Sequence, residues 1–264
     1  MVNRFRNRTV VVTGASAGIG RAMARRLIEA GANVGLVARR REALEELAGP
    51  NVAIFPGDVR DADFCSRAVE GTAEAFGGID CAIANAGISM NAPFASADLS
   101  VFREMMEVNY FGSLHVARFA HPHLKKSRGS LVFISSVVGK RGFPTRSGYS
   151  ASKFAVQALF ESLRVEWAPE GIHVGIVAPG YTETEIRVNA LGSDGKPRGE
   201  GGSTVGSVMS ADRAAESILK AAADRRRETI LTRGGKAMVL LNRFFPALAD
   251  RVSAKVVGDR KSVV

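Results

Sequence analysis

Short runs of apolar residues alternate along the chain with longer stretches in which apolar residues recur at helical spacing. The short runs are typical of strands buried on both faces, and the periodic stretches are typical of amphipathic helices. The runs lie at 9–13, 33–38, 51–55, 80–87, 130–135, 172–180 and 228–232, and helices are predicted over 21–31, 42–47, 63–76, 99–120, 147–167 and 211–224. This alternation predicts an α/β fold with a doubly wound parallel sheet of about seven strands and helices on both faces.

One glycine-rich segment interrupts the alternation. Six of the fifteen residues from Gly192 to Gly206 are glycine. Long loops in compact domains are usually lids or disordered segments. We therefore expect one α/β domain over residues 1–235, with a substrate lid around 181–210, followed by a basic amphipathic tail over 236–264.

The composition is that of a globular protein, with 46% hydrophobic and 23% charged residues in a chain of 264. Cys65 and Cys81 have neither the spacing of a zinc site nor that of a disulfide framework. No metal-ligand spacing connects the four histidines, His115, His121, His123 and His173. The N-terminus lacks the apolar segment of a secretory signal. We expect a cytoplasmic protein without a bound metal.

The net charge of +10 raises nucleic acid or an anionic membrane as partners. From Ala211 onward there are 12 Lys/Arg against 6 Asp/Glu, a balance of +6, whereas the first 210 residues carry 24 against 20, a balance of +4. Because the excess is concentrated in the C-terminal part and not spread along a groove, no nucleic acid is expected as partner.

A glycine-rich motif, TGASAGIG, follows the first predicted strand and leads into the first helix. Gly14, Gly18 and Gly20 let the backbone turn sharply and approach a pyrophosphate, which binds the amide groups at a helix N-terminus. The spacing is G-x-x-x-G-x-G, and the strand before it and the helix after it favour a dinucleotide site over an ordinary glycine turn.

Tyr149 and Lys153 stand four residues apart in SGYSASKFAV, so a helix would place both on one face. A phenol has an ordinary pKa of about 10, and an adjacent ammonium lowers that pKa because it favours the phenolate. A bare Y-x-x-x-K is usually an ordinary surface pair, so the other motifs decide its meaning.

Four motifs occur in order between residues 9 and 184: TGxxxGxG after the first strand, NAG at 85–87 after the fourth, a serine after the fifth, and Y-x-x-x-K. In this order and spacing the chain resembles the short-chain dehydrogenase/reductase family. The resemblance implies a single-domain Rossmann fold, a nicotinamide cofactor, and interconversion of a carbonyl and an alcohol on a small-molecule substrate.

The resemblance also implies catalytic roles. Tyr149 would be the general acid/base, and Lys153 would lower its pKa and hydrogen-bond the nicotinamide ribose. Ser136 would hold the substrate carbonyl, with Ser135 as an alternative. Asn109 would kink its helix and anchor a water on the proton path of Lys153. Open α/β sheets bind ligands at the carboxyl ends of their strands, where Gly14, Asn85, Ser136 and Pro179 are expected to converge.

The cofactor contacts implied by the resemblance lie at the same edge. Asp58 would contact the adenine, and Thr184 would bind the carboxamide, with Thr182 as a near alternative. The full implied set is Gly14, Ser16, Gly18, Ile19, Gly20, Arg39, Asp58, Val59, Asn85, Ala86, Gly87, Tyr149, Lys153, Pro179, Gly180, Thr182 and Thr184.

The end of the second strand favours NADP(H) over NAD(H). An acidic residue there would bind the 2′-hydroxyl of NAD, but Ala38 stands in its place and Arg39 begins a run of three arginines. Guanidinium matches a 2′-phosphate bidentately, and cations near a helix start are otherwise disfavoured by the helix dipole. Against this, the segment from Ala15 to Ala17 in the glycine loop offers no second basic residue.

Met90, Phe94, Phe143 and Ile186 in the predicted substrate loops favour an apolar substrate, lipid-, steroid- or acyl-like. The alternative function is a non-catalytic basic Rossmann adaptor or cofactor sensor. The complete set of Ser136, Tyr149, Lys153 and Asn109 argues against it, since a sensor has no use for an acid/base tyrosine. The resemblance also implies a homodimer or homotetramer whose helices near 99–120 and 150–167 pair.

The tail carries an apolar stripe at helical spacing, composed of Leu241, Phe244, Phe245, Leu248, Val252 and Val256, with Arg243, Arg251 and Lys255 away from it. Such a helix can lie in a membrane interface, which predicts peripheral membrane association. The alternative is that the stripe covers the chain's own cleft or a partner subunit. This alternative is favoured because amphipathic helices in globular proteins usually face a core, and Pro246 would interrupt or start a helix here.

Overall fold

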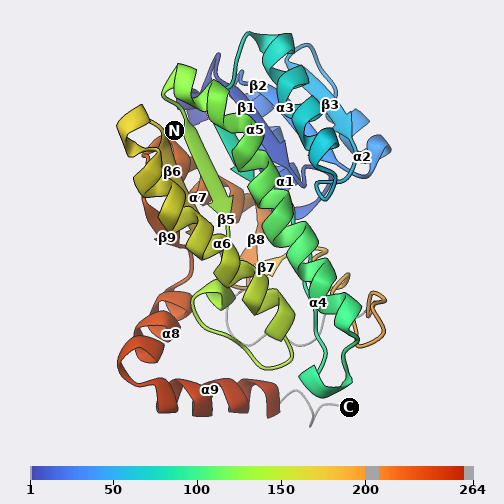
Figure 1. Cartoon of the computed structure of the whole chain (residues 1–264), viewed down its shortest axis with the longest axis vertical. Coiled ribbons are helices and arrows are strands. Elements are labelled where there is room, and N and C mark those ends of the chain that lie inside the picture. The colour runs from blue at the N-terminus through green and yellow to red at the C-terminus, as the bar shows by residue number, and fades with distance from the viewer. Residues whose placement is uncertain (1, 200–207, 259–264) are drawn as a thin grey trace.

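A seven-stranded parallel sheet in the order β3-β2-β1-β4-β5-β6-β9 forms the centre of the molecule (Figure 1). The structure is a computed structural model that describes residues 2–199 and 208–258. The strands are β1 (Thr9–Thr13), β2 (Asn33–Ala38), β3 (Val52–Pro56), β4 (Cys81–Ala84), β5 (Ser130–Ile134), β6 (His173–Ala178) and β9 (Glu228–Ile230). The predicted doubly wound sheet is therefore confirmed.

Helices cover both faces of the sheet. They are α1 (Gly18–Glu29), α2 (Arg41–Glu45), α3 (Ala62–Phe76), α4 (Leu99–Met105), α5 (Gly112–Ser127), α6 (Ser147–Glu166) and α7 (Ala211–Ala223). Side chains alternate along β1, so Val10 and Val12 pack with Leu27 of α1, whereas Val11 packs with Phe160 of α6 on the opposite face. Figure 1 shows α3, α5 and α6 in front of the sheet and α1 and α7 behind it.

The strand order places the ligand-binding edge. The chain moves outward from β1 through β2 to β3 and then returns to β4, which pairs with the other side of β1. Segments that follow β1 and β4 therefore leave the sheet in opposite directions, and a crevice opens between them at the carboxyl ends of the strands.

The helix predicted over 99–120, with a kink at Asn109, is divided by an irregular turn at that residue and extends beyond its predicted end. A π-helical turn, η3 (Met106–Phe111), separates α4 from α5, and α5 continues to Ser127 with Pro122 inside it. Asn109 lies in this turn and is fully buried. Its side chain binds the backbone of Ile88, which is a nonlocal contact that helical periodicity cannot reveal.

The described part of the predicted lid is tied to the body of the protein. β7 (Thr182–Glu183) pairs with β8 (Met209–Ser210), and Leu191 bridges to Met90. The amide of Asp98 also donates to the carbonyl of Ser193 at 2.9 Å. The prediction of a lid around 181–210 includes residues 200–207, which lie outside the described residues.

The tail forms two helices, α8 (Arg233–Phe244) and α9 (Pro246–Gly258), which lie beyond the carboxyl ends of the strands (Figure 1). Phe245 leaves helical geometry at φ −136° and ψ 64°, and Pro246 starts the second helix. Phe244, Phe245 and Leu248 are exposed, whereas Ala249 and Ser253 are the buried positions of α9. These three residues therefore do not cover the chain's own cleft, whereas the other part of the favoured expectation, that the stripe covers a partner subunit, stays a prediction.

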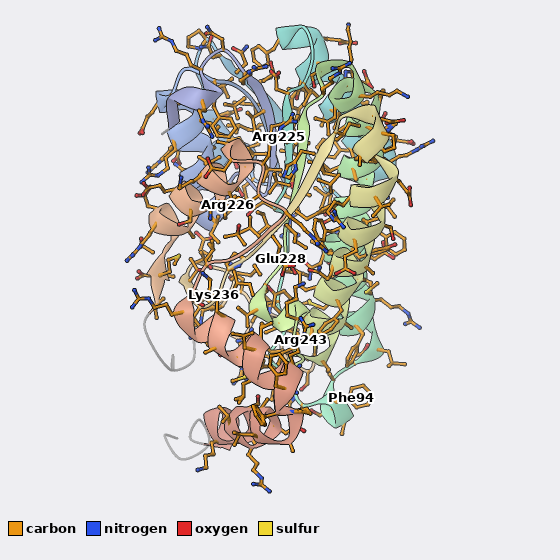
Figure 2. The ribbon with its side chains drawn as sticks, turned by 90° about the vertical axis from the view of Figure 1, so that its left-hand side faces the viewer. Phe94, Arg225, Arg226, Glu228, Lys236 and Arg243 are labelled. Carbon is orange, nitrogen blue, oxygen red and sulfur yellow. The ribbon has the colours of Figure 1, made fainter. Side chains whose placement is uncertain are left out.

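In Figure 2, Lys236 and Arg243 lie along α8 in the lower part of the view, whereas Arg225 lies in the upper part. Leu241 and Val252 are half-buried, and the side chain of Val256 lies outside the described residues. Within residues 2–199 and 208–258, no helix combines the length and the apolar character needed to cross a bilayer.

Candidate active site

The ends of β1 and β4 are joined by hydrogen bonds through one threonine. The hydroxyl oxygen of Thr13 accepts from the backbone amides of Asn85 and Ala86, each at 3.0 Å. The side-chain amide of Asn85 returns a bond to the Thr13 carbonyl at 2.8 Å. The glycine motif after β1 and the NAG segment after β4 are thereby held against each other.

Two of the motif glycines are required by packing within the protein. A Cβ on Gly20 would lie 2.1 Å from the carbonyl oxygen of Gly14. One on Gly14, where φ is +69°, would lie 2.9 Å from both the Asn85 side-chain nitrogen and the Ala86 Cα. No side chain fits at either position, so the loop approaches the NAG segment as closely as backbones allow.

The N-terminus of α1 is open to an anion. Its N-cap residue is Ala17, whose methyl group cannot accept a hydrogen bond from the first-turn amides. Gly18 starts the helix at φ +51°, and a Cβ there would lie 3.1 Å from Thr184 across the cleft. The first-turn amides have no side-chain cap, and the glycine leaves room for a ligand beside them. This arrangement fits the pyrophosphate of a dinucleotide.

A cleft of about 1150 Å³ runs over this edge of the sheet. It exceeds the roughly 300–1,000 Å³ of ordinary small-molecule pockets, as a dinucleotide together with a second ligand requires. Every residue predicted to bind cofactor lines it, from Gly14, Ser16, Ile19 and Gly20 through Arg39, Asp58, Val59, Asn85, Ala86 and Gly87 to Pro179, Gly180, Thr182 and Thr184. Ser136, Tyr149 and Lys153 line it as well, whereas Asn109 lies behind the wall.

Tyr149, in the first turn of α6, has only 9% of its surface exposed. Burial raises its pKa, while a hydrogen bond with Ser136 and the charge of Arg146 act in the lowering direction, and the net pKa lies above the ordinary value. The phenol therefore stays protonated at neutral pH and can donate. The resemblance implies that Lys153 brings the pKa of Tyr149 below its ordinary value. In the protein alone the pKa is raised, because desolvation of the phenolate outweighs the effect of nearby charges.

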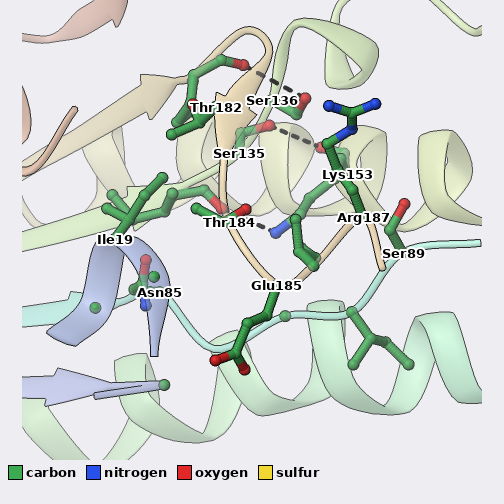
Figure 3. A pocket seen from close by; sticks show the side chains of 18 of the residues that line it. Ile19, Asn85, Ser89, Ser135, Ser136, Lys153, Thr182, Thr184, Glu185 and Arg187 are labelled. Atoms are coloured by element: carbon green, nitrogen blue, oxygen red, sulfur yellow. Dashed lines mark hydrogen bonds between the residues drawn. The ribbon is translucent and has the colours of Figure 1, made fainter. Parts of the chain in front are cut away.

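Lys153 lies one turn further along α6 and is 3% exposed. The side chain is labelled in Figure 3, and its ammonium donates to the carbonyl of Ile134 at 2.9 Å. The ammonium lies 6.0 Å from the centre of the Tyr149 ring. Burial lowers the pKa of Lys153 to about 8, because the cation is poorly solvated there. The side chain is thus poised to exchange a proton near neutral pH.

Ser136 and Ser135 have different environments. Ser136 precedes the short helix η4 (Val137–Gly139), its hydroxyl donates to the carbonyl of Pro179 at 3.5 Å, and it acts to lower the pKa of Tyr149. The Ser135 hydroxyl points instead to the backbone carbonyl of Lys153 at 3.5 Å (Figure 3). Ser136 is therefore the serine that shares a ligand-facing surface with the tyrosine.

Asn109 stabilises the wall behind Lys153. It accepts from the amide of Ile88 at 2.8 Å and donates to the Ile88 carbonyl and the Ser152 hydroxyl at 3.0 and 2.9 Å. A Cβ on Gly87 would lie 3.0 Å from the Asn109 carbonyl oxygen and 3.4 Å from the Lys153 nitrogen. Only the small Gly87 thus lies between the amide and the ammonium.

The arginine run supplies a contact that the sequence did not reveal. Arg40, the N-cap of α2, reaches the glycine loop, where its guanidinium lies 3.4 Å from the hydroxyl and carbonyl oxygens of Ser16. It also pairs with Glu185 of the lid segment at 3.1 Å. A basic residue therefore lies against the glycine loop, supplied by the N-cap of α2, and only the tertiary structure could show this contact.

Asp58 lies near Arg39, the first residue of the arginine run. Burial acts to raise its pKa, but hydrogen bonds from Arg60 and the charge of Arg39 bring it below the ordinary value. Arg60 holds the carboxylate with its backbone amide at 3.0 Å and its guanidinium at 2.7 Å. Asp58 is thus an ionised, fixed acceptor at the edge of the cleft, with Arg39 nearby.

Both apolar and polar residues line the cleft outside the predicted cofactor set. The apolar residues include Val138, Phe143, Ile186 and Met238, and the cations Arg146 and Arg187 and the polar Glu185 and Asn189 line it as well. Two residues predicted to face the substrate do not line it. Met90 is buried in the core, and Phe94 is 71% exposed with its ring against Phe102.

Within the part of the chain that the structure describes, no three His, Cys, Asp or Glu side chains are grouped so that they could hold a metal.

The family model of the short chain dehydrogenases matches residues 8–193. A chain with this fold and this tyrosine–lysine cleft therefore belongs to the short-chain dehydrogenase/reductase family of oxidoreductases, whose members bind NAD(H) or NADP(H).

Similar proteins carry the name of the same family. The chain is 36% identical over 273 residues to mouse dehydrogenase/reductase SDR family member 7B, with 98% of this chain and 84% of the relative covered. It is 33% identical to the dehydrogenase/reductase SDR family protein 7-like of Dictyostelium discoideum, with 97% of this chain and 83% of the relative covered. A short chain dehydrogenase from Burkholderia cenocepacia, solved in complex with NADP, superposes with a TM-score of 0.81 at 27% identity, with 94% and 98% covered.

The lowered pKa of Lys153 makes folding stability depend on pH. Between about 8 and 10.5 the unfolded chain binds the proton and the folded chain does not, so stability rises with pH through this window. We expect wild type to gain about 3 kcal/mol relative to Lys153→Met between pH 7 and 10.5. Urea unfolding of both proteins at several pH values measures the difference, and a difference independent of pH would contradict the assigned pKa.

Proposed function

We propose that the protein is an NADP(H)-dependent oxidoreductase that interconverts a ketone or aldehyde and an alcohol. The observation that carries the proposal is the buried Tyr149, followed one turn later by Lys153, and both line a dinucleotide-sized cleft together with Ser136. The class of oxidoreductase follows from the family. The reaction and the cofactor preference are argued from the residues.

In reduction, the nicotinamide supplies a hydride to the carbonyl carbon when it is bound. Tyr149 donates its phenolic proton to the carbonyl oxygen, because its raised pKa keeps it protonated until that oxygen becomes basic. Ser136 donates a hydrogen bond to the same oxygen and stabilises the negative charge that develops there. In oxidation the same residues act in reverse.

Lys153 restores the proton. Its pKa of about 8 lies close to neutral pH, so it can pass a proton toward the phenolate at little cost. A water held by the carbonyl oxygen of Asn109 beside Gly87 would connect this ammonium to solvent. The path is supported by the position of Gly87, because a Cβ there would meet both the side-chain oxygen of Asn109 and the ammonium of Lys153.

Preference for NADP(H) rests on Arg39 and Arg40. Ala38 ends β2 where an acidic residue would bind a ribose 2′-hydroxyl, and the two guanidiniums that follow line the cleft. Arg40 also lies over Ser16, between the glycine loop and the lid segment. The Burkholderia cenocepacia relative, which binds NADP, adds support. Guanidinium pairs recognise phosphate bidentately.

The substrate is an apolar carbonyl compound, lipid-, steroid- or acyl-like. Val138, Phe143, Ile186 and Met238 support this class because they offer apolar surface in the cleft. Apolar walls with a few convergent polar groups are the usual form of a site that orients such a substrate.

A second copy of the chain is the proposed partner in solution, in a dimer or tetramer. Phe111 at the end of η3 and Phe154 on the adjoining α6 remain 37% and 44% exposed on elements that pack together. Aromatic residues on neighbouring helices are suited to a symmetric interface.

Tyr149→Phe removes only the proton donor. We expect kcat for ketone reduction to fall about 100- to 10,000-fold while affinity for NADPH stays near wild type. Tyr110→Phe is the matched control, since Tyr110 contacts Phe111 and does not line the cleft. Turnover of apolar ketones with NADPH measures kcat, and near-wild-type turnover in Tyr149→Phe would show that another group is the acid.

Arg39→Ala and Arg40→Ala should each weaken NADPH binding about 10- to 100-fold, because a charge-assisted contact to the 2′-phosphate is lost. NADH binding should change little. Arg41→Ala is the control, because Arg41 pairs with Glu45 at 3.6 Å and does not line the cleft. Fluorescence titration gives both dissociation constants, and equal losses for both cofactors would refute the NADP preference.

Light scattering at micromolar concentration should give at least twice the chain mass of 28.0 kDa. Phe111→Glu with Phe154→Glu should halve the measured mass, because two like charges would be buried in the symmetric contact. A wild-type mass of one chain would contradict the proposed oligomer.

A further inference from the structure

The two tail helices present apolar side chains that the proposed reaction does not use. Leu240, Phe244, Phe245 and Leu248 are 57%, 65%, 63% and 48% exposed. We call these four residues the tail face. They come from the last turns of α8 and the first turn of α9, and Leu240 and Phe244 share one side of α8 at i and i+4.

The tail face is surrounded by positive charge. Exposed cations on the same two helices are Arg233, which also lines the cleft, Lys236, Arg243, Arg251 and Lys255. The acid in this stretch, Asp250, already pairs with Arg141 of the body at 2.7 Å. The guanidinium of Arg243 lies 5.8 Å from the centre of the Phe244 ring. In the described part of the chain none of these five cations has a salt-bridge partner.

Contacts with the body hold the tail face in position. Ala249 and Ser253 of α9 are buried, and Arg141 bonds the Ser253 hydroxyl at 3.2 Å in addition to Asp250. On α8, Gly235 is buried and Met238 lines the cleft. The apolar residues are therefore exposed on helices that are docked, not on a loose extension.

The tail face lies at the cleft end of the molecule. Both views place α8 and α9 beyond the carboxyl ends of the strands, and Phe94 lies at that same end (Figures 1 and 2). Phe94 and Leu99 are 71% and 65% exposed, so apolar surface is present on the neighbouring segment too. Met238 connects the two features, since it belongs to α8 and lines the cleft.

Charge argues against a second copy as the occupant. A two-fold interface pairs a patch with itself, so five unpaired cations would meet five more. Nucleic acid is also a poor match, because phosphate contacts need cations at the centre and not two phenylalanines and two leucines. Apolar residues that enter the boundary between headgroups and acyl chains, with cations against anionic headgroups, match this arrangement.

We propose that the tail face docks the protein on an anionic lipid bilayer, with Leu240, Phe244, Phe245 and Leu248 in the interface and the five cations at headgroup phosphates and carboxylates. Docking there brings the α8 wall of the cleft to the membrane, from which an apolar substrate could enter. The docking itself does not depend on the proposed reaction.

The test is co-sedimentation of the full chain with vesicles. With phosphatidylserine in phosphatidylcholine we expect most of the protein to pellet at low salt and less at high salt, and much less to pellet with phosphatidylcholine alone. Leu240→Ser with Phe244→Ser should lower the partition coefficient about tenfold or more. Val165→Ser, at a 63% exposed position on α6, is the apolar control and should bind as wild type.

Charge reversal tests the contact between the tail cations and the anionic headgroups. Lys236→Glu with Arg243→Glu should lower binding to anionic vesicles about tenfold or more. Arg118→Glu with Lys126→Glu changes the net charge equally on exposed positions of α5 and should retain binding. All these residues are exposed, and thermal unfolding of each variant checks that the fold is intact.

Three results would overturn the proposal: no pelleting of the full chain with anionic vesicles, equal loss in both charge-reversal pairs, or wild-type binding by the folded Leu240→Ser/Phe244→Ser variant. If those serine substitutions instead lower the mass measured by light scattering without changing vesicle binding, the tail face is a contact between copies. Loss of vesicle binding with normal NADPH turnover would support docking and leave the proposed reaction untouched.

Discussion

The site depends on the hydrogen bonds that join β1 to β4. The Thr13 hydroxyl oxygen accepts from two successive backbone amides, of Asn85 and Ala86, and the Asn85 side chain returns a bond to Thr13. Buried backbone amides are costly when unpaired, so this threonine makes it possible for β4 to end and turn away at that point. The cleft opens because the two chains diverge from there.

The need to pair buried polar groups also applies to α6 and to the neighbouring turn η3. Lys153 gives up solvent and gains the Ile134 carbonyl, while Asn109 bonds the backbone of Ile88 and the hydroxyl of Ser152. Desolvation shifts the pKa of Lys153 down and that of Tyr149 up. Each shift favours the neutral form of its group, because a buried charge is poorly solvated, and brings the pKa of Lys153 close to neutral pH.

Charge is distributed unevenly around this site. Arg39 and Arg40 lie at one end of the cleft, Arg146 and Arg187 near the substrate side, and the tail cations outside it. The basic composition therefore reflects several local tasks, each with its own geometry. A net charge of +10 alone could not distinguish them.

The local pattern was sufficient for the strands and the cofactor motifs, because strand burial and glycine turns are properties of contiguous residues. β1, β2 and β5 begin where apolar runs predicted them, and all cofactor residues assigned by motif line one cleft. The tertiary structure decided the remaining questions: that the Ser135 hydroxyl is directed to the backbone carbonyl of Lys153, that Arg40 reaches Ser16, that the kink expected at Asn109 takes the form of a π-helical turn, and that Phe244 faces outward. Each of these depends on a partner distant in sequence or on burial by the assembled fold, and periodicity along a single segment carries no information about either.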